Sequence, residues 1–147
     1  MSRFIVSVLF ALALGGCGAA QKPLPTGLGC PDHGEPLRVV VTAPLSQRGN
    51  TLMVTCTIEN RSGQPVSGVR YVSGYFDGHT EPTAQDVAHA EQQLAITLAP
   101  GETKAVVLVA GETVVVGGLT KCFGVRAVPV TIGDHQLTAA EAWDGTH

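Results

Sequence analysis

The sequence predicts an all-β domain of six to eight strands, because its composition and its polarity pattern both favour strands over helices. Charged residues make up only 14% of the chain, and 18 glycines occur alongside many valines, alanines and threonines, which is typical of a β domain with many turns. The segment TLMVTCTIE at 51–59 alternates in polarity over nine residues, and one of its faces carries Leu52, Val54, Cys56 and Ile58. Turn clusters such as NRSGQP separate this segment from other apolar runs.

Further strands are predicted wherever alternating or β-branched residues run between turn signals. The predicted strands cover residues 37–43, 51–59, 66–76, 93–98, 103–110, 113–117 and 121–132. We expect a core that includes Leu52, Val54, Ile58, Val106, Leu108 and Val125. Pro129 has no backbone N–H to donate, so it places the end of the last strand at a sheet edge or a bulge.

Three segments interrupt or follow this pattern. Residues 44–50 predict a loop, and residues 77–92 predict a loop with a short helix, because Thr83 and Asp86 have the spacing of a helix-capping pair. The polar tail, residues 133–147, is compatible with one short edge strand around 136–140.

Two stretches, TCTIENRSGQPVSGVRYVSGYFDG and LAPGETKAVVLV, resemble the immunoglobulin-like adhesion and cell-envelope modules of bacteria. Those modules share an asparagine-bearing turn after one strand and an L-x-P-G-E turn before another. The matching positions here are Ile58, Asn60, Ser62, Gly63, Leu98, Pro100, Gly101 and Glu102. The resemblance covers about residues 37–132 and implies an immunoglobulin-like antiparallel β-sandwich with a short insertion at 77–92. Turn motifs support a fold rather than a function.

The N-terminus has the features of an export signal. Arg3 precedes the uncharged stretch Phe4–Leu14, which is too short to cross a hydrocarbon core of about 30 Å as a helix but suits a signal peptide. The residues Leu14-Gly15-Gly16-Cys17 then resemble the bacterial lipobox. That resemblance implies a signal peptide at 1–16, cleavage before Cys17, and acylation of Cys17 with fatty acyl chains such as palmitate.

The resemblance also bears on location and on partners. In such lipoproteins an Asp directly after the acylated cysteine resembles an inner-membrane retention signal. Residue 18 is Gly instead, which favours the outer membrane with the domain facing the periplasm. Residues 17–36 then form a flexible tether, because they hold four prolines and no periodic pattern. From Cys17 onward, eight basic residues oppose twelve acidic ones, so nucleic acid is a poor candidate partner.

Three cysteines remain after Cys17, and an exported protein permits a disulfide between two of them. In an immunoglobulin-like topology the strands at 51–59 and 121–132 run parallel in opposite sheets. Cys56 and Cys122 would then be offset by about four residues, or about 13 Å, whereas a disulfide needs Cα atoms within about 7 Å. We therefore predict a Cys30–Cys122 disulfide and a buried Cys56.

The sequence carries no catalytic motif that withstands scrutiny, so we predict a non-enzyme without a cofactor: an outer-membrane lipoprotein that binds or scaffolds another envelope protein. The alternative is a periplasmic metal-handling protein that uses Cys30 and His33, although no second close pair of ligands accompanies them. Tyr71 and Tyr75 share one face of their predicted strand. They are candidates for partner binding, and the alternative is that they pack within the sheet or the core.

Overall fold

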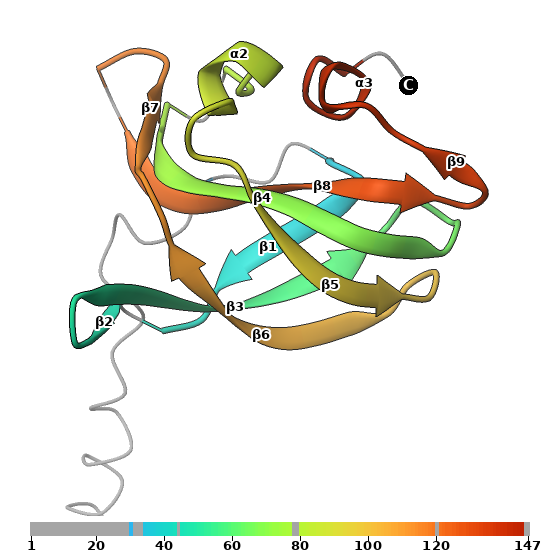
Figure 1. The fold of residues 1–147 in the computed structure, drawn as a ribbon, viewed down its shortest axis with the longest axis horizontal. Helices are drawn as coiled ribbons and strands as arrows, with labels where there is room; N and C mark the ends of the chain where they lie inside the picture. Colours follow the sequence, from blue (N-terminus) through green and yellow to red (C-terminus); the bar gives the residue numbers. More distant parts are fainter. Residues whose placement is uncertain (1–29, 31–33, 44, 78–79, 120, 146–147) are drawn as a thin grey trace, which may run out of the picture.

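In the described part of the chain, two β-sheets pack face to face, and two short helices lie on the outside of one of them (Figure 1). The computed structural model of the chain describes residues 30, 34–43, 45–77, 80–119 and 121–145. The elements within these ranges are β1 (Leu37–Val41), β2 (Ser46–Arg48), β3 (Thr51–Asn60), β4 (Val66–Phe76), α2 (Ala84–Val87), β5 (Gln92–Leu98), β6 (Thr103–Ala110), β7 (Val114–Val116), β8 (Cys122–Ile132), β9 (His135–Gln136) and α3 (Ala139–Trp143). The all-β prediction is confirmed.

Strand β3 is the centre of the first sheet, called the β3 sheet below. On one side it pairs with β6, from Leu52 opposite Ala110 to Glu59 opposite Thr103. Its other edge is shared by two shorter strands, because β1 lies beside the second half of β3 and β2 lies beside its first three residues. All three pairings are antiparallel.

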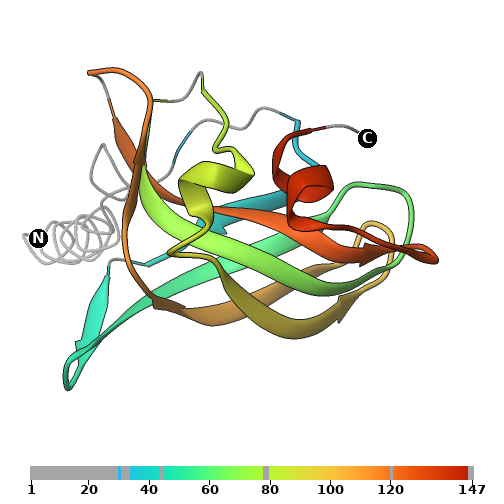
Figure 2. The same cartoon turned by 45° about the horizontal axis from the view of Figure 1, so that its top comes forward.

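Strand β4 is the centre of the second sheet, called the β4 sheet, whose order is β5-β4-β8-β9. β8 pairs with β4 antiparallel, from Val66 opposite Ile132 to Phe76 opposite Cys122. On the other side of β4, β5 pairs antiparallel with its first half and β7 pairs in parallel with Gly74–Phe76. Figure 2 shows the long β4 and β8 strands running beneath both helices.

The main core lies between the two sheets. The alternation of β3 sends Val54, Cys56 and Ile58 inward, where all three are fully buried. Their neighbours in this layer come from both sheets and include Leu37, Val41, Val66, Val69, Tyr71, Leu98, Leu108, Phe123, Val125 and Ala127. Burying such side chains stabilises the fold by about 1.5–3 kcal/mol for each large one, so this layer provides most of the driving force.

A second apolar cluster lies on the outer face of the β4 sheet. There Val72 and Phe76 of β4 pack against Val87 of α2 and Trp143 of α3. The two helices are short, and each begins with a capping box: Thr83 with Asp86, and Thr138 with Glu141. β4 is therefore buried on both faces, which explains why both faces of VSGVRYVSGYF are apolar.

The two turn motifs singled out in the sequence meet in space. The side-chain amide of Asn60 donates to the carbonyl oxygens of Gln64, Leu98 and Ala99, at 2.7, 3.1 and 3.2 Å. The backbone of Asn60 also bonds to Glu102 and Gly101 in the turn between β5 and β6. Asn60 is fully buried, so it joins the end of β3 to that turn without contact with water.

Three details differ from the sequence-based expectation. The described residues form nine strands rather than six to eight, partly because the positive-φ turn at Gly49 lets β3 fold back on Ser46–Arg48, which pairs with it as β2. In the tail, Gln136 lies in β9, but Ala139 starts a helix because the hydroxyl of Thr138 caps it. Leu52 shares the inner face of β3 but is 44% exposed, since it lies beyond the last layer of the core.

The predicted signal peptide, Cys17 and most of the tether lie outside the described residues, which begin at Cys30. Within the described part of the chain, no helix is both long and apolar enough to cross a membrane.

Candidate functional site

The two candidate tyrosines have different environments, although they share a face of β4. Tyr71 is only 5% exposed and belongs to the core between the sheets. Its hydroxyl lies 3.2 Å from the carbonyl oxygen of Val109 and 2.8 Å from the side-chain amide of Gln92, and burial raises its pKa. Tyr75 is 46% exposed and contacts Phe123 edge to face, with ring centroids 5.4 Å apart. The alternative of core packing therefore applies to Tyr71, whereas Tyr75 remains accessible.

The cysteines are arranged as predicted. Cys30 and Cys122 form a disulfide that joins the start of the described chain to the start of β8. Cys56 is a free thiol with no exposed surface, and burial raises its pKa to about 11. Because its sulfur is bonded, Cys30 offers no thiolate to a metal, and His33 lies outside the described residues. Among the residues that the structure describes, no three His, Cys, Asp or Glu side chains converge on a possible metal site.

Much of the segment at 77–92, which the sequence suggested as an irregular insertion, covers the β4 sheet. Val87 and Ala90 are buried in the outer cluster. Glu91 accepts a hydrogen bond from the indole N–H of Trp143 at 2.6 Å and forms an ion pair with Arg70 at 2.9 Å. These contacts connect β4, the insertion and α3, so this part of the insertion has a structural role.

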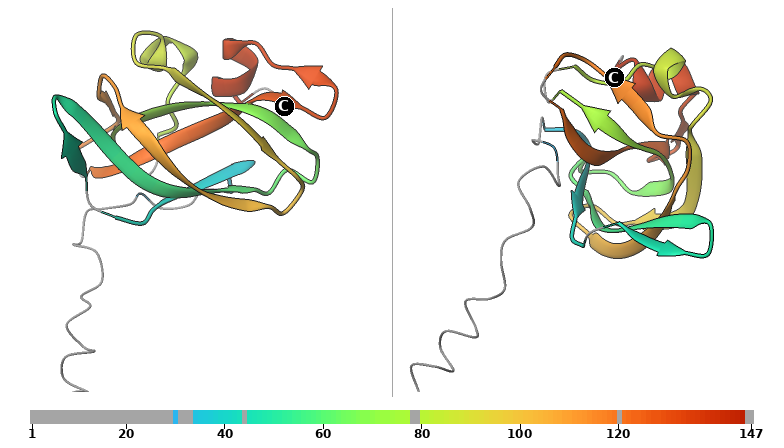
Figure 3. Two further views of the ribbon diagram at one scale, coloured as in Figure 1. Left: turned by 60° about the horizontal axis from the view of Figure 1, so that its bottom comes forward. Right: turned by 90° about the vertical axis from the view of Figure 1, so that its left-hand side faces the viewer.

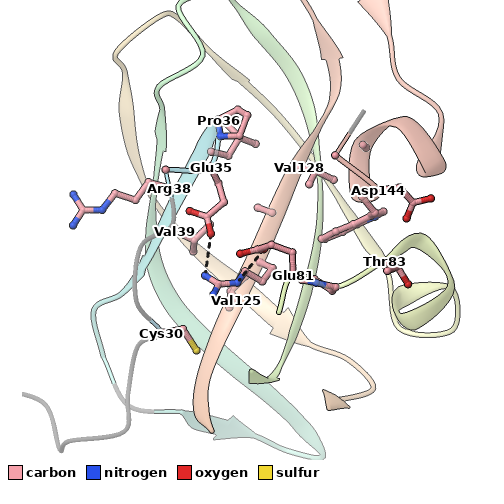
Figure 4. A pocket seen from close by; sticks show the side chains of 18 of the residues that line it. Cys30, Glu35, Pro36, Arg38, Val39, Glu81, Thr83, Val125, Val128 and Asp144 are labelled. Atoms are coloured by element: carbon pink, nitrogen blue, oxygen red, sulfur yellow. Dashed lines mark ion pairs between the residues drawn. The ribbon is translucent and has the colours of Figure 1, made fainter. Parts of the chain in front are cut away.

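A groove of about 910 Å³ runs along β8. One wall is β1, from Leu37 to Val41, and the floor is the middle of β8, from Val125 to Val128. The opposite wall consists of Glu81–Thr83 and the end of α3 (Figure 4). Valine, leucine and tryptophan side chains line it together with a few charged groups, which is the usual character of a binding site.

Arg126 is the most unusual residue of this groove, because it is a charged side chain that is only 8% exposed. Its guanidinium lies over the ring of Phe76, 5.2 Å from the centroid. Two carboxylates approach it: Glu35 at 3.5 Å from Nη1 and Glu81 at 3.8 Å from Nε. Charge-assisted hydrogen bonds are shorter, about 2.7–2.9 Å, so these contacts leave its donors poorly satisfied. Nε and Nη2 are buried and have no hydrogen-bond partner among the described residues.

The charges around the groove limit what it can bind. The described residues that line the groove include three carboxylates, of Glu35, Glu81 and Asp144, and two guanidinium groups, of Arg38 and Arg126, so acidic groups are in excess. A ligand with a free carboxylate would be repelled, whereas a neutral group with both donors and acceptors could bind to both kinds of charge. The peptide bond is such a group.

Sequence analysis did not identify Arg126. The available signal was the position of an arginine within the apolar strand KCFGVRAVPVTI, because a charge in such a run is either buried and paired or marks a site. Comparison with known proteins identified no matching family model, no similar curated protein and no similar solved structure.

Proposed function

We propose that this chain is a non-catalytic lipoprotein of the bacterial envelope, anchored through Cys17 in the outer membrane, whose immunoglobulin-like sandwich binds an extended segment of a protein partner. The strand order supports the fold assignment. One sheet has the order β1-β3-β6 and the other has β5-β4-β8-β9. With β2 and β7 left aside, this order resembles the division of an immunoglobulin-like domain in which the strands usually called A, B and E face C′, C, F and G, and it supports the proposed assignment.

The disulfide supports export of the domain. Disulfides persist in the periplasm and are rare in the cytosol, where thiols are kept reduced. The Cys30–Cys122 bond therefore agrees with a signal peptide at 1–16 and a lipid at Cys17.

The groove along β8 carries the proposal of binding, and its decisive feature is Arg126. Two of its donors, Nε and Nη2, are buried without a hydrogen-bond acceptor among the described residues, which costs about 1–3 kcal/mol for each unsatisfied group. A partner strand that displaces the exposed Glu81 side chain would bring a peptide carbonyl to these donors. Its alternate side chains would point toward the apolar wall of β1, in the manner of a strand added at a sheet edge.

Acylation and partner binding are tested separately. A clickable fatty acid should label the wild type and not Cys17→Ser, and absence of label from the wild type removes the lipoprotein assignment. A photo-crosslinking amino acid at Arg38, on the groove wall, should capture a partner in native membranes. The same amino acid at Val107, on the outer face of the β3 sheet, should not.

The contribution of Arg126 is measured in the same assay. Arg126→Met keeps an unbranched apolar stem and removes the donors, so the crosslink from position 38 should weaken several-fold while the fold persists. Fluorescence of the buried Trp143 reports whether the fold is retained. Equal crosslinking by the folded Met variant would exclude the guanidinium from the binding site.

A further inference from the structure

The exposed large apolar side chains of the described residues fall into two groups. Three lie on the outer face of the β3 sheet, and the other five gather at one end of the sandwich. The first group is Val40, Val107 and Val109, and the second, called the end patch below, is Leu45, Leu52, Tyr75, Val115 and Leu119.

Strand register places the end patch at one end. The side chain of Asn60, at the end of β3, donates a hydrogen bond to the carbonyl oxygen of Leu98, and Leu98 lies opposite Val66. β4 therefore begins near the end of β3, and it finishes at Phe76 at the other end of the sandwich. β3 runs the other way and therefore starts at the end where β4 finishes. The β2–β3 hairpin and β7 lie toward the same end of the molecule (Figure 3, left).

Members of the end patch lie on the inner faces of both sheets. Leu52 is two residues before the buried Val54, so it faces inward from the β3 sheet. Tyr75 is four residues after the buried Tyr71 and lies opposite Val115 in the parallel pairing with β7. At this end, no other described element packs over these inward faces, and Val115 is 61% exposed. Leu45 and Leu119 lie on the adjoining loops and Leu119 is fully exposed.

The opposite end of the sandwich is different. Its turns, at 61–65 and 99–102, contain none of the exposed large apolar residues of the described chain. The asymmetry shows that the end patch is not a general property of the ends of this sandwich.

The end patch lies at the same end of the sandwich as Cys30, where the described chain begins. Cys30 is bonded to Cys122, the first residue of β8, which lies opposite Phe76 at the finish of β4. Cys17 precedes Cys30 by thirteen residues. A fully extended chain of that length reaches at most about 45 Å. A lipid at Cys17 therefore keeps this end of the domain near the bilayer.

We propose that the end patch rests on the lipid surface and forms a second contact with the membrane that holds the lipid anchor. The inference depends on the proposed acylation of Cys17. Leucine and valine side chains gain free energy when they enter the boundary between headgroups and acyl chains, and tyrosine is suited to that boundary because its ring is apolar and its hydroxyl is polar. Exposed Arg48 and Lys121 lie at the same end and can approach lipid phosphates. With the end patch on the membrane, the two sheets would project away from it.

The test uses the full acylated chain in vesicles of phosphatidylethanolamine and phosphatidylglycerol. An environment-sensitive dye is attached at Leu119→Cys in the end patch. The matched control carries the dye at Thr103→Cys, at the start of β6 and at the opposite end of the sandwich. Labelling is selective because Cys30 and Cys122 are bonded and Cys56 is buried. We expect quenching by aqueous iodide to be several-fold weaker at position 119 than at position 103, and quenching by bromine-labelled lipid to occur only at 119.

Other results overturn the proposal in distinguishable ways. If the wild type does not float with vesicles, acylation fails and the inference fails with it. If the protein floats but the two dyes are equally quenched by iodide, the anchor stands and the surface contact is refuted. In the absence of vesicles, iodide quenching of the dye at position 119 in the Cys17→Ser protein is measured at increasing protein concentration. If the quenching becomes weaker as the protein concentration rises, the end patch binds a second copy of the chain instead of lipid.

Discussion

Replacing Asn60 with aspartate perturbs the one buried polar side chain that joins both turn motifs. The substitution preserves shape and keeps the oxygen that accepts hydrogen bonds from the N–H and hydroxyl of Ser62, at 3.0 and 2.7 Å. It removes the amide that donates to the carbonyl oxygens of Gln64, Leu98 and Ala99. At neutral pH, a buried carboxylate would then face three carbonyl oxygens.

The cost follows from these contacts. Leaving buried acceptors without a donor costs about 1–3 kcal/mol, and burying an uncompensated charge costs more. The two hydrogen bonds from Ser62 offset part of this cost, so we expect a loss of about 2–4 kcal/mol at pH 7. For a domain of this size that corresponds to a fall in Tm of roughly 10–15 °C.

The loss should depend on pH in a defined direction. Burial and the facing carbonyls raise the pKa of the new carboxyl above its unfolded value near 4. A group with a raised folded pKa stabilises below its unfolded pKa and loses that contribution as the pH rises through the folded one. The penalty of Asn60→Asp should therefore be smaller at pH 4 than at pH 7, because a protonated carboxyl again donates one hydrogen bond.

Denaturant unfolding followed by the fluorescence of the single Trp143 measures both effects, in a Cys17→Ser background that removes the acylation site. The matched control is Asn50→Asp in the exposed turn between β2 and β3, which should change stability by less than about 0.5 kcal/mol at either pH. If Asn60→Asp behaves like the control, or if its penalty is the same at both pH values, the assigned role of the Asn60 amide is wrong.

Three further predictions concern the cysteines and tyrosines. Because burial raises the pKa of Cys56 to about 11, the folded state should lose stability as the pH rises from 9 toward 11, by up to about 3 kcal/mol. Unfolding free energies across that range should show this loss in the wild type and not in Cys56→Ala. Reduction of the Cys30–Cys122 bond, which spans a sequence separation of 92, should cost about 4 kcal/mol, and non-reducing peptide mapping that instead finds a Cys56–Cys122 pair would contradict the fold. Tyr71→Ser should destabilise by about 3 kcal/mol or more and Tyr75→Ser by less than about 1 kcal/mol, and similar losses for both in denaturant unfolding would refute the assigned difference in burial.

The pairing of Cys30 with Cys122 shows where a correct prediction had an incomplete reason. The sequence argument excluded Cys56 by its offset along the strands. In the structure Cys56 and Cys122 also lie in different layers. Cys56 is in the core between the sheets, whereas Cys122 packs in the outer cluster. A face can be assigned by alternation within one strand, but the layer that each face meets depends on how the sheets stack.

Local signals in the sequence determined seven of the strands, the capping of α2 and the turns around Asn60, because each depends on residues that are close together along the chain. Alternation makes β3 a strand wherever it lies, and Thr83 caps the helix that follows it. Only the tertiary structure decided which of these residues reach solvent. Leu52 and Val54 share one face, as do Tyr75 and Tyr71, yet in each pair one residue is exposed because its strand extends past the opposing sheet. The groove at Arg126 has the same origin, since β1, β8 and the ends of the helices are brought together by long-range packing that period and propensity do not encode.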